Sequence, residues 1–365
     1  MISIDFSGAK FNSSEEKIAP FLDQFKNSGQ GFFDALDDDF SELKTFVANS
    51  KSFEKTVILG IGGSALGARM LRDALGGQDL EVLDTIDSVE VEKIKNLEQT
   101  RFIVISKSGN TLETKKLLDF FWEKVPRENF VFITEGKSLL HRRAETENIP
   151  VFAMPPNIGG RFSVLTAVGI LPALFSGIDM DGVLKGARAM RGKFLSHSAE
   201  ENLPFQLASA IMHSGKSQLV HFPYISSLRT MGAWWTQLVA ESTGKEGKGF
   251  TPISAVGPTD QHSLLQLLTE GPDSFFTFFI KNTAPDASFG MLLNTELEAT
   301  AQSLSELGRP NCTIEINDVS PETIGELTAL WMGTVVFLGS FLKINSFDQP
   351  GVERGKVIAG AMINN

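Results

Sequence analysis

Short apolar runs alternate with amphipathic stretches along most of this chain. In the first half, runs of strand-like composition lie at residues 57–59, 81–83, 102–105, 130–133 and 151–154. Amphipathic stretches, such as residues 65–75 and 112–122, separate them. Continuous apolar strands that alternate with helices predict a parallel sheet with helices on both faces. We therefore expect this half of the chain to form a doubly wound α/β fold.

A second series of the same kind follows. Its strand-like runs lie at residues 218–222, 252–256, 274–280 and 313–316. The charged segment 179–193 between the two series is predicted to be a linker. The apolar stretches 162–175 and 327–342 are predicted to be buried helices. This pattern indicates two doubly wound subdomains of similar size, in which ligands bind beyond the carboxyl ends of the strands.

The beginning of the chain lacks this alternation. Its residues are polar, with an acidic cluster at 37–39, and we expect a peripheral N-terminal arm over residues 1–40. The first subdomain then covers residues 41–182 and contains the Gly-rich and Ser-rich loops. The second subdomain covers residues 183–365.

Composition and charge narrow the functional classes. The net charge of −11 argues against a nucleic-acid partner, because binding to phosphate backbones requires clustered Lys and Arg. The N-terminus has no basic start followed by an apolar run, and the longest uncharged apolar stretch is short for a membrane span. Cys312 is the only cysteine, which excludes an intramolecular disulfide and a clustered-cysteine metal site. These features predict a cytoplasmic protein that binds neither membrane nor nucleic acid.

The motif GIGGSALG follows the first strand-like run and precedes a helix. Gly60, Gly62 and Gly63 allow the backbone to approach a ligand closely, and Ser64 adds a hydroxyl group. The same residues fit the G-x-G-x-x-A pattern of a dinucleotide site, with Asp84 near the end of the next strand. A tight strand-to-helix turn without a ligand is the third interpretation.

The motif SKSGNTLET is more informative. Ser106, Ser108 and Thr111 offer three hydroxyl groups at the start of a helix, where unpaired N–H groups and the helix dipole favour a phosphate. Helix capping by Asn110 and Glu113 is the structural alternative. Capping does not explain the two serines, so the motif favours a phosphate site.

Four further polar residues suit proton-transfer chemistry. Glu241 ends an apolar helix in the motif QLVAESTGK, and a carboxylate in a partly dry pocket suits a general base. Arg161 follows two glycines and precedes an apolar helix, where its charge opposes the helix dipole and a structural role is disfavoured. His262 lies in GPTDQHS and Lys356 in GVERGK. A helix-end glutamate, a structural histidine and a solvated lysine are the alternatives. The histidines lack the spacing of a metal site.

These motifs, in this order, resemble those of the glucose-6-phosphate isomerase (phosphoglucose isomerase) family. The resemblance runs from about residue 56 to the C-terminus. The stretch FDQPGVERGK and the pairing of ESTGK with DQHS are specific to that family, whereas GIGGS and SKSG indicate a sugar-isomerase (SIS) domain in general. The resemblance implies two SIS-type, flavodoxin-like subdomains. It also implies reversible isomerisation of glucose 6-phosphate and fructose 6-phosphate through ring opening and a cis-enediol, without a cofactor or metal.

The resemblance also assigns residue roles. Glu241 is the expected base, and Arg161 is expected to stabilise the enediolate. His262, contributed by the neighbouring subunit of a homodimer with shared sites, is expected to open the sugar ring, and Lys356 is expected near the ring oxygen. Glu353 is expected to pair with a nearby cation. The residues expected to bind the substrate and its phosphate are Gly63, Ser64, Ser106, Lys107, Ser108, Thr111, Gly160, Gln237 and Gln349.

Position 110 departs from the family pattern and leaves a second activity open. Family members usually carry Thr there, whereas Asn110 is similar to the residue of bifunctional phosphoglucose/phosphomannose isomerases. A non-catalytic phosphosugar-binding regulator would keep the SKSGNT loop, but it would not need Glu241, His262 and Lys356 together. The chain is also shorter than typical members, so we expect the dimer contacts of their longer termini to be smaller or replaced.

Overall fold

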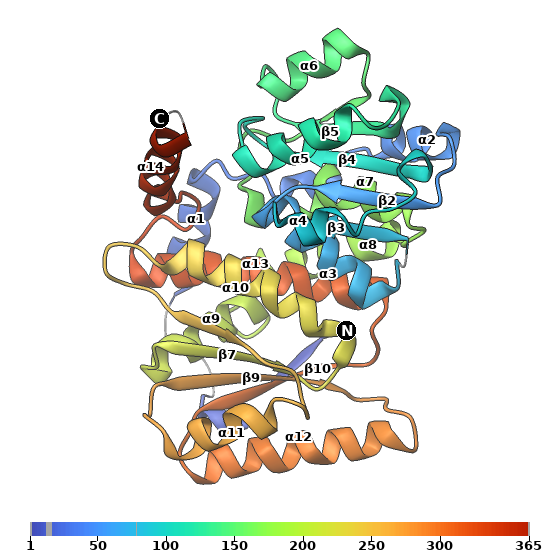
Figure 1. Cartoon of the computed structure of the whole chain (residues 1–365). Coiled ribbons are helices and arrows are strands. Elements are labelled where there is room, and N and C mark those ends of the chain that lie inside the picture. Colours follow the sequence, from blue (N-terminus) through green and yellow to red (C-terminus); the bar gives the residue numbers. More distant parts are fainter. Residues whose placement is uncertain (1, 12–16, 78, 364–365) are drawn as a thin grey trace.

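The computed structural model describes residues 2–11, 17–77 and 79–363, which form two five-stranded sheets covered by helices (Figure 1). The first sheet contains β2 (Lys55–Leu59), β3 (Leu80–Leu83), β4 (Thr100–Ile105), β5 (Phe130–Thr134) and β6 (Val151–Ala153). All neighbours run parallel, in the order β3-β2-β4-β5-β6. This is the flavodoxin-like order, in which the winding direction reverses between β2 and β4. The five strands predicted for this half are confirmed.

Helices cover both faces of the first sheet. They are α3 (Leu66–Leu75), α4 (Ser88–Val91), α5 (Leu112–Trp122), α6 (Leu139–Glu147) and α7 (Ala167–Phe175), with α2 (Ser41–Asn49) packed on α7. Val57 and Leu59 of β2 belong to one apolar cluster with α5 and α6, whereas Ile58 belongs to another with α3 and α7. Successive side chains thus face opposite layers, and the predicted doubly wound fold is confirmed.

The second sheet repeats this plan. Its strands are β1 (Ser3–Asp5), β7 (Gln218–Pro223), β8 (Thr251–Ser254), β9 (Phe275–Asn282) and β10 (Asn311–Ile316), in the order β1-β10-β9-β7-β8. Its covering helices are α9 (Leu203–Ser214), α10 (Arg229–Thr243), α11 (Gln261–Glu270), α12 (Phe289–Glu306) and α13 (Pro321–Leu342). Phe222 and Phe279 pack with α11 and α12, whereas Phe278 packs with Trp235 of α10 and Trp331 of α13. The predicted strands of this half are also confirmed.

The described part of the first 40 residues is not an irregular arm. Strand β1 pairs antiparallel with β10, and helix α1 (Ala19–Asn27) packs on α13. Phe25, Phe32 and Phe33 are buried against one another. Isolated phenylalanines among polar residues show no strand or helix period, so the sequence pattern did not indicate this packing. The segment 12–16 of the expected arm lies outside the described residues.

The segment expected to be a linker is helix α8 (Met180–Phe194). Its apolar side chains are buried against α13, whereas the charged side chain of Lys185 is exposed. The two helices approach so closely that a Cβ at Gly186 would lie 1.8 Å from the carbonyl oxygen of Glu322. The linker prediction was wrong because the charges of one face masked the apolar face. The predicted subdomain boundary after residue 182 falls inside this helix.

The two apolar stretches fold as follows. Residues Gly160–Leu165 form a 3-10 turn, and α7 begins after Thr166, whose hydroxyl oxygen accepts the Val168 N–H at 3.4 Å. The prediction of one continuous helix was therefore only partly right. Helix α13 is buried, as predicted. By length and composition alone it could cross a membrane, but 83% of its most apolar window is buried inside the protein.

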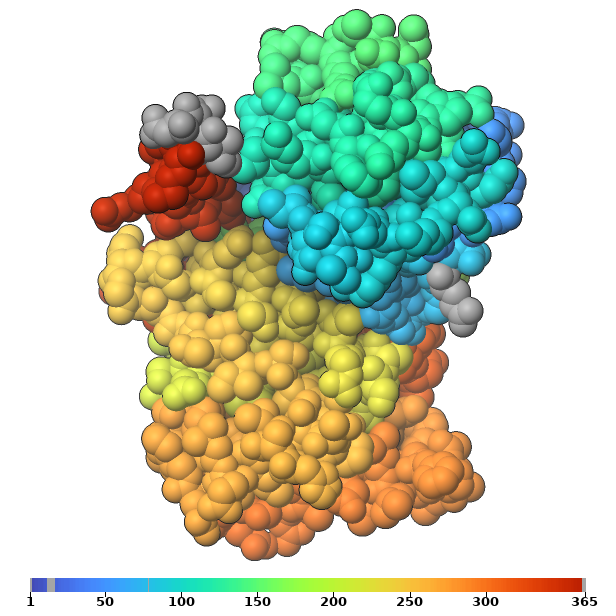
Figure 2. Space-filling view, in the orientation of Figure 1, coloured from blue at the N-terminus to red at the C-terminus, as the bar shows by residue number. Residues whose placement is uncertain are grey.

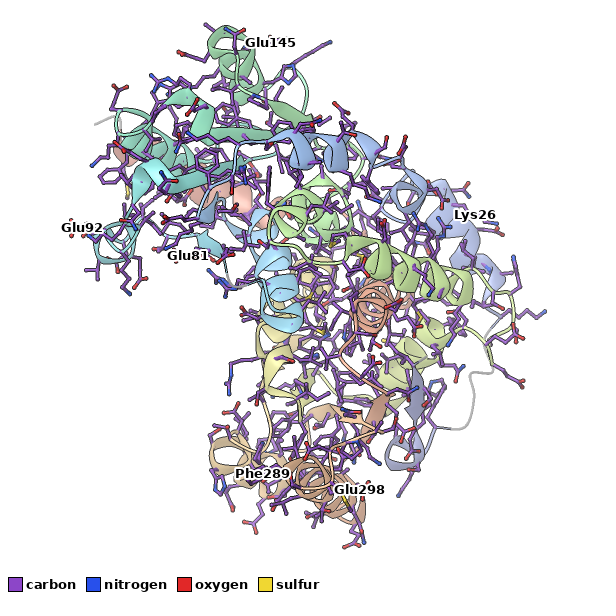
Figure 3. All side chains as sticks on the ribbon, turned by 90° about the vertical axis from the view of Figure 1, so that its right-hand side faces the viewer. Lys26, Glu81, Glu92, Glu145, Phe289 and Glu298 are labelled. Atoms are coloured by element: carbon purple, nitrogen blue, oxygen red, sulfur yellow. The ribbon has the colours of Figure 1, made fainter. Side chains whose placement is uncertain are left out.

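The two sheets lie one above the other, with α10 and α13 between them (Figure 1). In Figure 3, Glu145 of α6 lies at one end of the molecule, and Phe289 and Glu298 of α12 lie at the other. The last helix, α14 (Glu353–Ile363), protrudes from one side of the molecule, as the dark red spheres of Figure 2 show. Its described side chains are almost all exposed.

Candidate active site

Two loops meet at the carboxyl edge of the first sheet, because β2 and β4 are parallel neighbours. The Gly-rich loop follows β2, and Gly62 in it has a φ of +59°, which favours glycine. A Cβ at Gly60 would lie 3.2 Å from the carbonyl oxygen of Ile105, at the end of β4. The loops thus lie at the switch point of the sheet, where such folds bind ligands. Asp84, which a dinucleotide site would use, pairs instead with Arg69 at 2.8 Å.

The Ser-rich loop after β4 is held by its own hydroxyl groups. Ser106 Oγ lies 3.0 Å from Thr111 Oγ1, and the backbone N–H of Asn110 donates to Ser108 Oγ at 3.2 Å. Thr111, not Asn110, is the N-cap residue of α5, and its side chain makes no capping hydrogen bond. The capping alternative therefore places the cap at the wrong residue. Ser108 and Asn110 are exposed, so the loop presents a hydroxyl group beside the helix N-terminus.

Lys107 joins this loop to the segment that leads to Arg161. Its Nζ donates to the carbonyl oxygens of Pro156 at 2.7 Å and Ile158 at 3.0 Å. Burial lowers the pKa of Lys107, and the carboxylate of Glu135 opposes this effect. A lysine that binds two backbone carbonyl groups fixes the distance between the two segments.

Gly63 and Gly160 bring the first loop against the segment that contains Arg161. A Cβ at Gly63 would lie 2.2 Å from the carbonyl carbon of Gly160 and 2.7 Å from the backbone nitrogen of Arg161. No side chain fits at that distance, so glycine is required for this contact. Ser64 ends the 3-10 turn that begins at Gly62 and is partly buried.

Arg161 is the centre of the site. Its side chain is fully buried, and its guanidinium donates five hydrogen bonds. Three go to side chains: Nε to Ser242 Oγ at 2.9 Å, one Nη to Glu241 at 3.2 Å and to Gln349 at 2.9 Å. The other Nη donates to backbone carbonyl oxygens of Ser346 and Asp348, at 2.5 and 3.0 Å. Three segments that are distant in sequence therefore meet at one cation.

Burial lowers the pKa of Arg161, whereas the adjacent Glu241 carboxylate raises it by charge and by hydrogen bonding. An arginine remains charged under such opposing effects because its intrinsic pKa is above 12. The buried guanidinium is thus a fixed positive charge, held in one orientation by five acceptors. Such a charge can stabilise an oxyanion without reorganisation.

Glu241 lies in the last turn of α10 and lines a cavity of about 470 Å³ together with Lys245, Asp348 and Gln349. Its side chain is 27% exposed, and its second oxygen accepts a hydrogen bond from Gln237 Nε2 at 3.1 Å. The ESTGK and FDQPG motifs therefore meet at this cavity, where Arg161 binds Glu241 and Gln349.

Gln237 also has an unused acceptor. Its Oε1 is buried and has no hydrogen-bond partner among the residues that the structure describes. Its Nε2 lies 3.0 Å from the position of a Cβ at Gly62, so the side chain also borders the Gly-rich loop. A buried acceptor beside a carboxylate suits a hydroxyl group of a ligand.

His262 is not brought to this cavity within the subunit. It is exposed near the start of α11, which covers the face of the second sheet opposite α10. The neighbouring Gln261 anchors the helix by donating to Tyr224 Oη and Thr300 Oγ1, both at 2.7 Å. The sequence predicted His262 as a site residue, and within one subunit the structure leaves it apart from Glu241.

Lys356 also lies apart from the cavity. It is exposed on α14, and its Nζ pairs with Glu353 at 2.7 Å. The cavity lining ends at Val352, just before this helix. The expected role of Glu353 as a partner of a nearby cation is confirmed.

Two residues of the site were not predicted. Ser242 binds Arg161 directly, and Lys245 lines the cavity with only 9% of its side chain exposed. Both belong to the ESTGK motif, which was the available signal. The carbonyl acceptors of Ser346 and Asp348 had no signal, because backbone groups carry no residue type. Over residues 2–11, 17–77 and 79–363, no group of three His, Cys, Asp or Glu side chains is placed to hold a metal ion.

The sequence of this chain matches a known protein family. The sequence model of the family described as phosphoglucose isomerase matches residues 43–286 and 294–365. A glucose-6-phosphate isomerase of Carboxydothermus hydrogenoformans is 36% identical over 94% of this chain and 87% of its own length.

Solved structures have the same fold. A hypothetical protein of Thermus thermophilus superposes with a TM-score of 0.91, at 29% identity, over all of both chains. A glucose-6-phosphate isomerase of Chlamydia trachomatis superposes with a TM-score of 0.80, at 26% identity, over 98% of this chain and 77% of its own. Since the family model covers most of the chain and a relative above 30% identity extends over nearly all of it, this chain belongs to the phosphoglucose isomerase family.

Proposed function

We propose that this chain catalyses the reversible isomerisation of glucose 6-phosphate and fructose 6-phosphate, as a cytoplasmic enzyme without a cofactor. The observation that carries the proposal is the pairing of the partly exposed Glu241 carboxylate with the buried Arg161 guanidinium, at 3.2 Å, in the wall of a cavity. Family membership supports the same reaction.

The pair suits the proton transfer that this reaction needs. Glu241 removes the proton from C2 of the open-chain aldose and returns it to C1 of the cis-enediol, so no atom is gained or lost. The fixed charge of Arg161 stabilises the enediolate oxygen as it forms. Gln237 and Gln349 hold the two charged groups and contact sugar hydroxyl groups, for which the unpaired Oε1 of Gln237 is available.

The phosphate group is proposed to bind at the loops of the first sheet. Ser106, Ser108 and Thr111 supply hydroxyl groups, and the N-terminus of α5 supplies N–H groups. Lys107 adds positive charge next to these groups while it holds the Pro156 carbonyl. The Gly63 and Gly160 contact, with Ser64 beside it, then sets the spacing between the phosphate end and the Arg161 end of the substrate.

Neither His262 nor Lys356, the residues expected to act in ring opening, lines this cavity within one subunit. We propose a homodimer in which His262 enters the cavity of the neighbouring copy and docking of α14 brings Lys356 close. The exposure of apolar side chains on α14 supports this arrangement: Val357 is 72% exposed and Met362 is 74% exposed. A partner surface would remove this apolar area from water.

The direct test is conversion of fructose 6-phosphate to glucose 6-phosphate by purified protein, with mannose 6-phosphate assayed in parallel. Glu241→Gln should abolish most turnover, and Glu306→Gln is its matched control. Glu306 also ends a helix and accepts a hydrogen bond from a glutamine four residues earlier, but it is exposed on α12. Binding of the sugar phosphate without turnover by the wild-type protein would contradict the proposed activity.

A further inference from the structure

Lys245 is a nearly buried cation for which the proposed proton transfer has no use. It follows the end of α10 by two residues, and 9% of its side chain is exposed. Its Nζ pairs with Asp348 Oδ1 at 3.0 Å and donates a hydrogen bond to the carbonyl oxygen of Asn345. Burial lowers the pKa of Lys245, and hydrogen bonding to Asp348 opposes that effect. A charged group that has lost its hydration needs a compensating contact, and the segment 345–348 supplies it.

Three of the five acceptors of Arg161 come from the same part of the chain. Ser346 and Asp348 offer their carbonyl oxygens, and Gln349 offers its side-chain oxygen. The segment is thus held at Asn345 and Asp348 by a lysine, and at Ser346, Asp348 and Gln349 by an arginine. No regular helix or strand fixes it, since it lies between α13 and a 3-10 turn that begins at Pro350.

We infer that Lys245 is a positioning residue for the isomerisation. It holds the segment 345–349 in place, so that Gln349 and the carbonyl oxygens of Ser346 and Asp348 keep Arg161 against Glu241. This inference rests on the proposed function. Lys245 acts through the segment and not on the substrate. Its loss allows the segment to move away, and the guanidinium then loses acceptors that fix its orientation.

Loss of the contact between Lys245 and the segment 345–349 should affect the catalytic step and phosphate binding differently. The phosphate loops lie after β2 and β4, and none of their residues lines the cavity that contains Lys245. Loss of this contact therefore slows the catalytic step and leaves phosphate binding intact. Loss of one hydrogen bond to a charged group corresponds to a change of about ten- to hundredfold.

The test compares Lys245→Met with Lys248→Met. Both remove one positive charge from the same loop, but Lys248 donates to the carbonyl oxygen of Leu342 and pairs with Glu246, and neither of these partners belongs to the segment 345–349. In Lys245→Met, kcat should fall about tenfold or more while the inhibition constant for inorganic phosphate stays within about twofold. Amide hydrogen exchange of residues 344–352 should become faster. Lys248→Met should show none of these changes.

Two further variants keep the test decisive. Lys245→Arg retains the charge and the N–H donors, and it should recover most of the lost kcat. Asp348→Asn removes the ion pair at a half-exposed position, so it should fold even if Lys245→Met does not, and it should show the same split between kcat and phosphate inhibition. The inference is overturned by a normal kcat in Lys245→Met, by an equal loss in Lys248→Met, or by unchanged exchange. An inactive wild type would refute the proposed function alone, because the exchange measurement still tests the contact.

Discussion

Acid should destabilise this protein through one buried histidine. His221 of β7 is fully buried against the rings of Trp235 and Trp331, whose centroids lie 5.2 and 5.7 Å away. Neither ring nitrogen has a hydrogen-bond partner among the described residues. Burial lowers the pKa of His221 to about 3, so the imidazole is neutral in the folded protein at any ordinary pH.

The direction and size of the effect follow from linkage. The pKa of a histidine in the unfolded chain is about 6.5, above the folded value, so the unfolded chain binds the extra proton. The contribution to stability is fully present above about pH 6.5 and is lost as the pH falls toward 3, at about 1.36 kcal/mol per pH unit. Between about pH 7.5 and 4.5 the loss from this one group is about 2.7 kcal/mol.

The perturbation that isolates this effect is His221→Phe. A phenyl ring is flat and apolar, so it removes the titration without leaving a polar group unpaired. The free energy of unfolding of both proteins is measured by urea denaturation at the two pH values, followed by tryptophan fluorescence. Carboxylates that also respond to acid are common to both proteins and cancel in the comparison. The wild type should lose about 2.7 kcal/mol more than the variant. Equal losses, within about 0.5 kcal/mol, would refute the buried neutral imidazole.

The remaining predictions concern the site. Glu241→Gln should lower kcat by about 10²–10⁴-fold while phosphate binding is mostly retained, because only proton acceptance is removed; steady-state kinetics that show a near-normal kcat would remove Glu241 from the mechanism. Ser108→Ala combined with Thr111→Ala should weaken inhibition by a phosphorylated competitive inhibitor at least tenfold, since each hydroxyl contributes about 1.5–3 kcal/mol to a charged acceptor; an unchanged inhibition constant would place the phosphate elsewhere. Mixing inactive Glu241→Gln with inactive His262→Ala should restore activity, to about half per heterodimer by site counting, if sites are shared between subunits. Once both parents are shown to fold and exchange subunits, absence of activity in the mixture would mean that His262 acts within its own chain.

All strands of the two sheets except β1 were predictable, because most of them are apolar runs bounded by Gly or polar residues. The strand ends then located the loops, since parallel strands place their carboxyl ends at one edge. Helix α8 escaped prediction because its exposed charges dominate its composition, although its apolar side is buried. The N-terminal segment escaped because β1 has three residues and gains its stability from β10, some 300 positions away.

The site was predictable only as far as it consists of side chains in motifs. Glu241, Arg161 and Gln349 meet as their motifs indicated. The carbonyl groups that hold Arg161 were invisible, because any residue at those positions presents the same acceptor. His262 illustrates a second limit: a residue that completes a site in another copy is not brought to the site within one chain, so neither the motif nor a single subunit tests its role.

The five acceptors of Arg161 also bear on how the protein is made. They come from residues 241–242 and 346–349, so the guanidinium cannot have all five until residue 349 has left the ribosome. A chain truncated before Ser346 would bury a guanidinium that lacks three of its five acceptors, and each unsatisfied buried hydrogen-bond group costs about 1–3 kcal/mol. Premature termination should therefore yield a protein that fails quality control, not a weakly active enzyme. The acceptors at residues 346–349, which are synthesised last, complete the set of contacts that orients the Arg161 guanidinium.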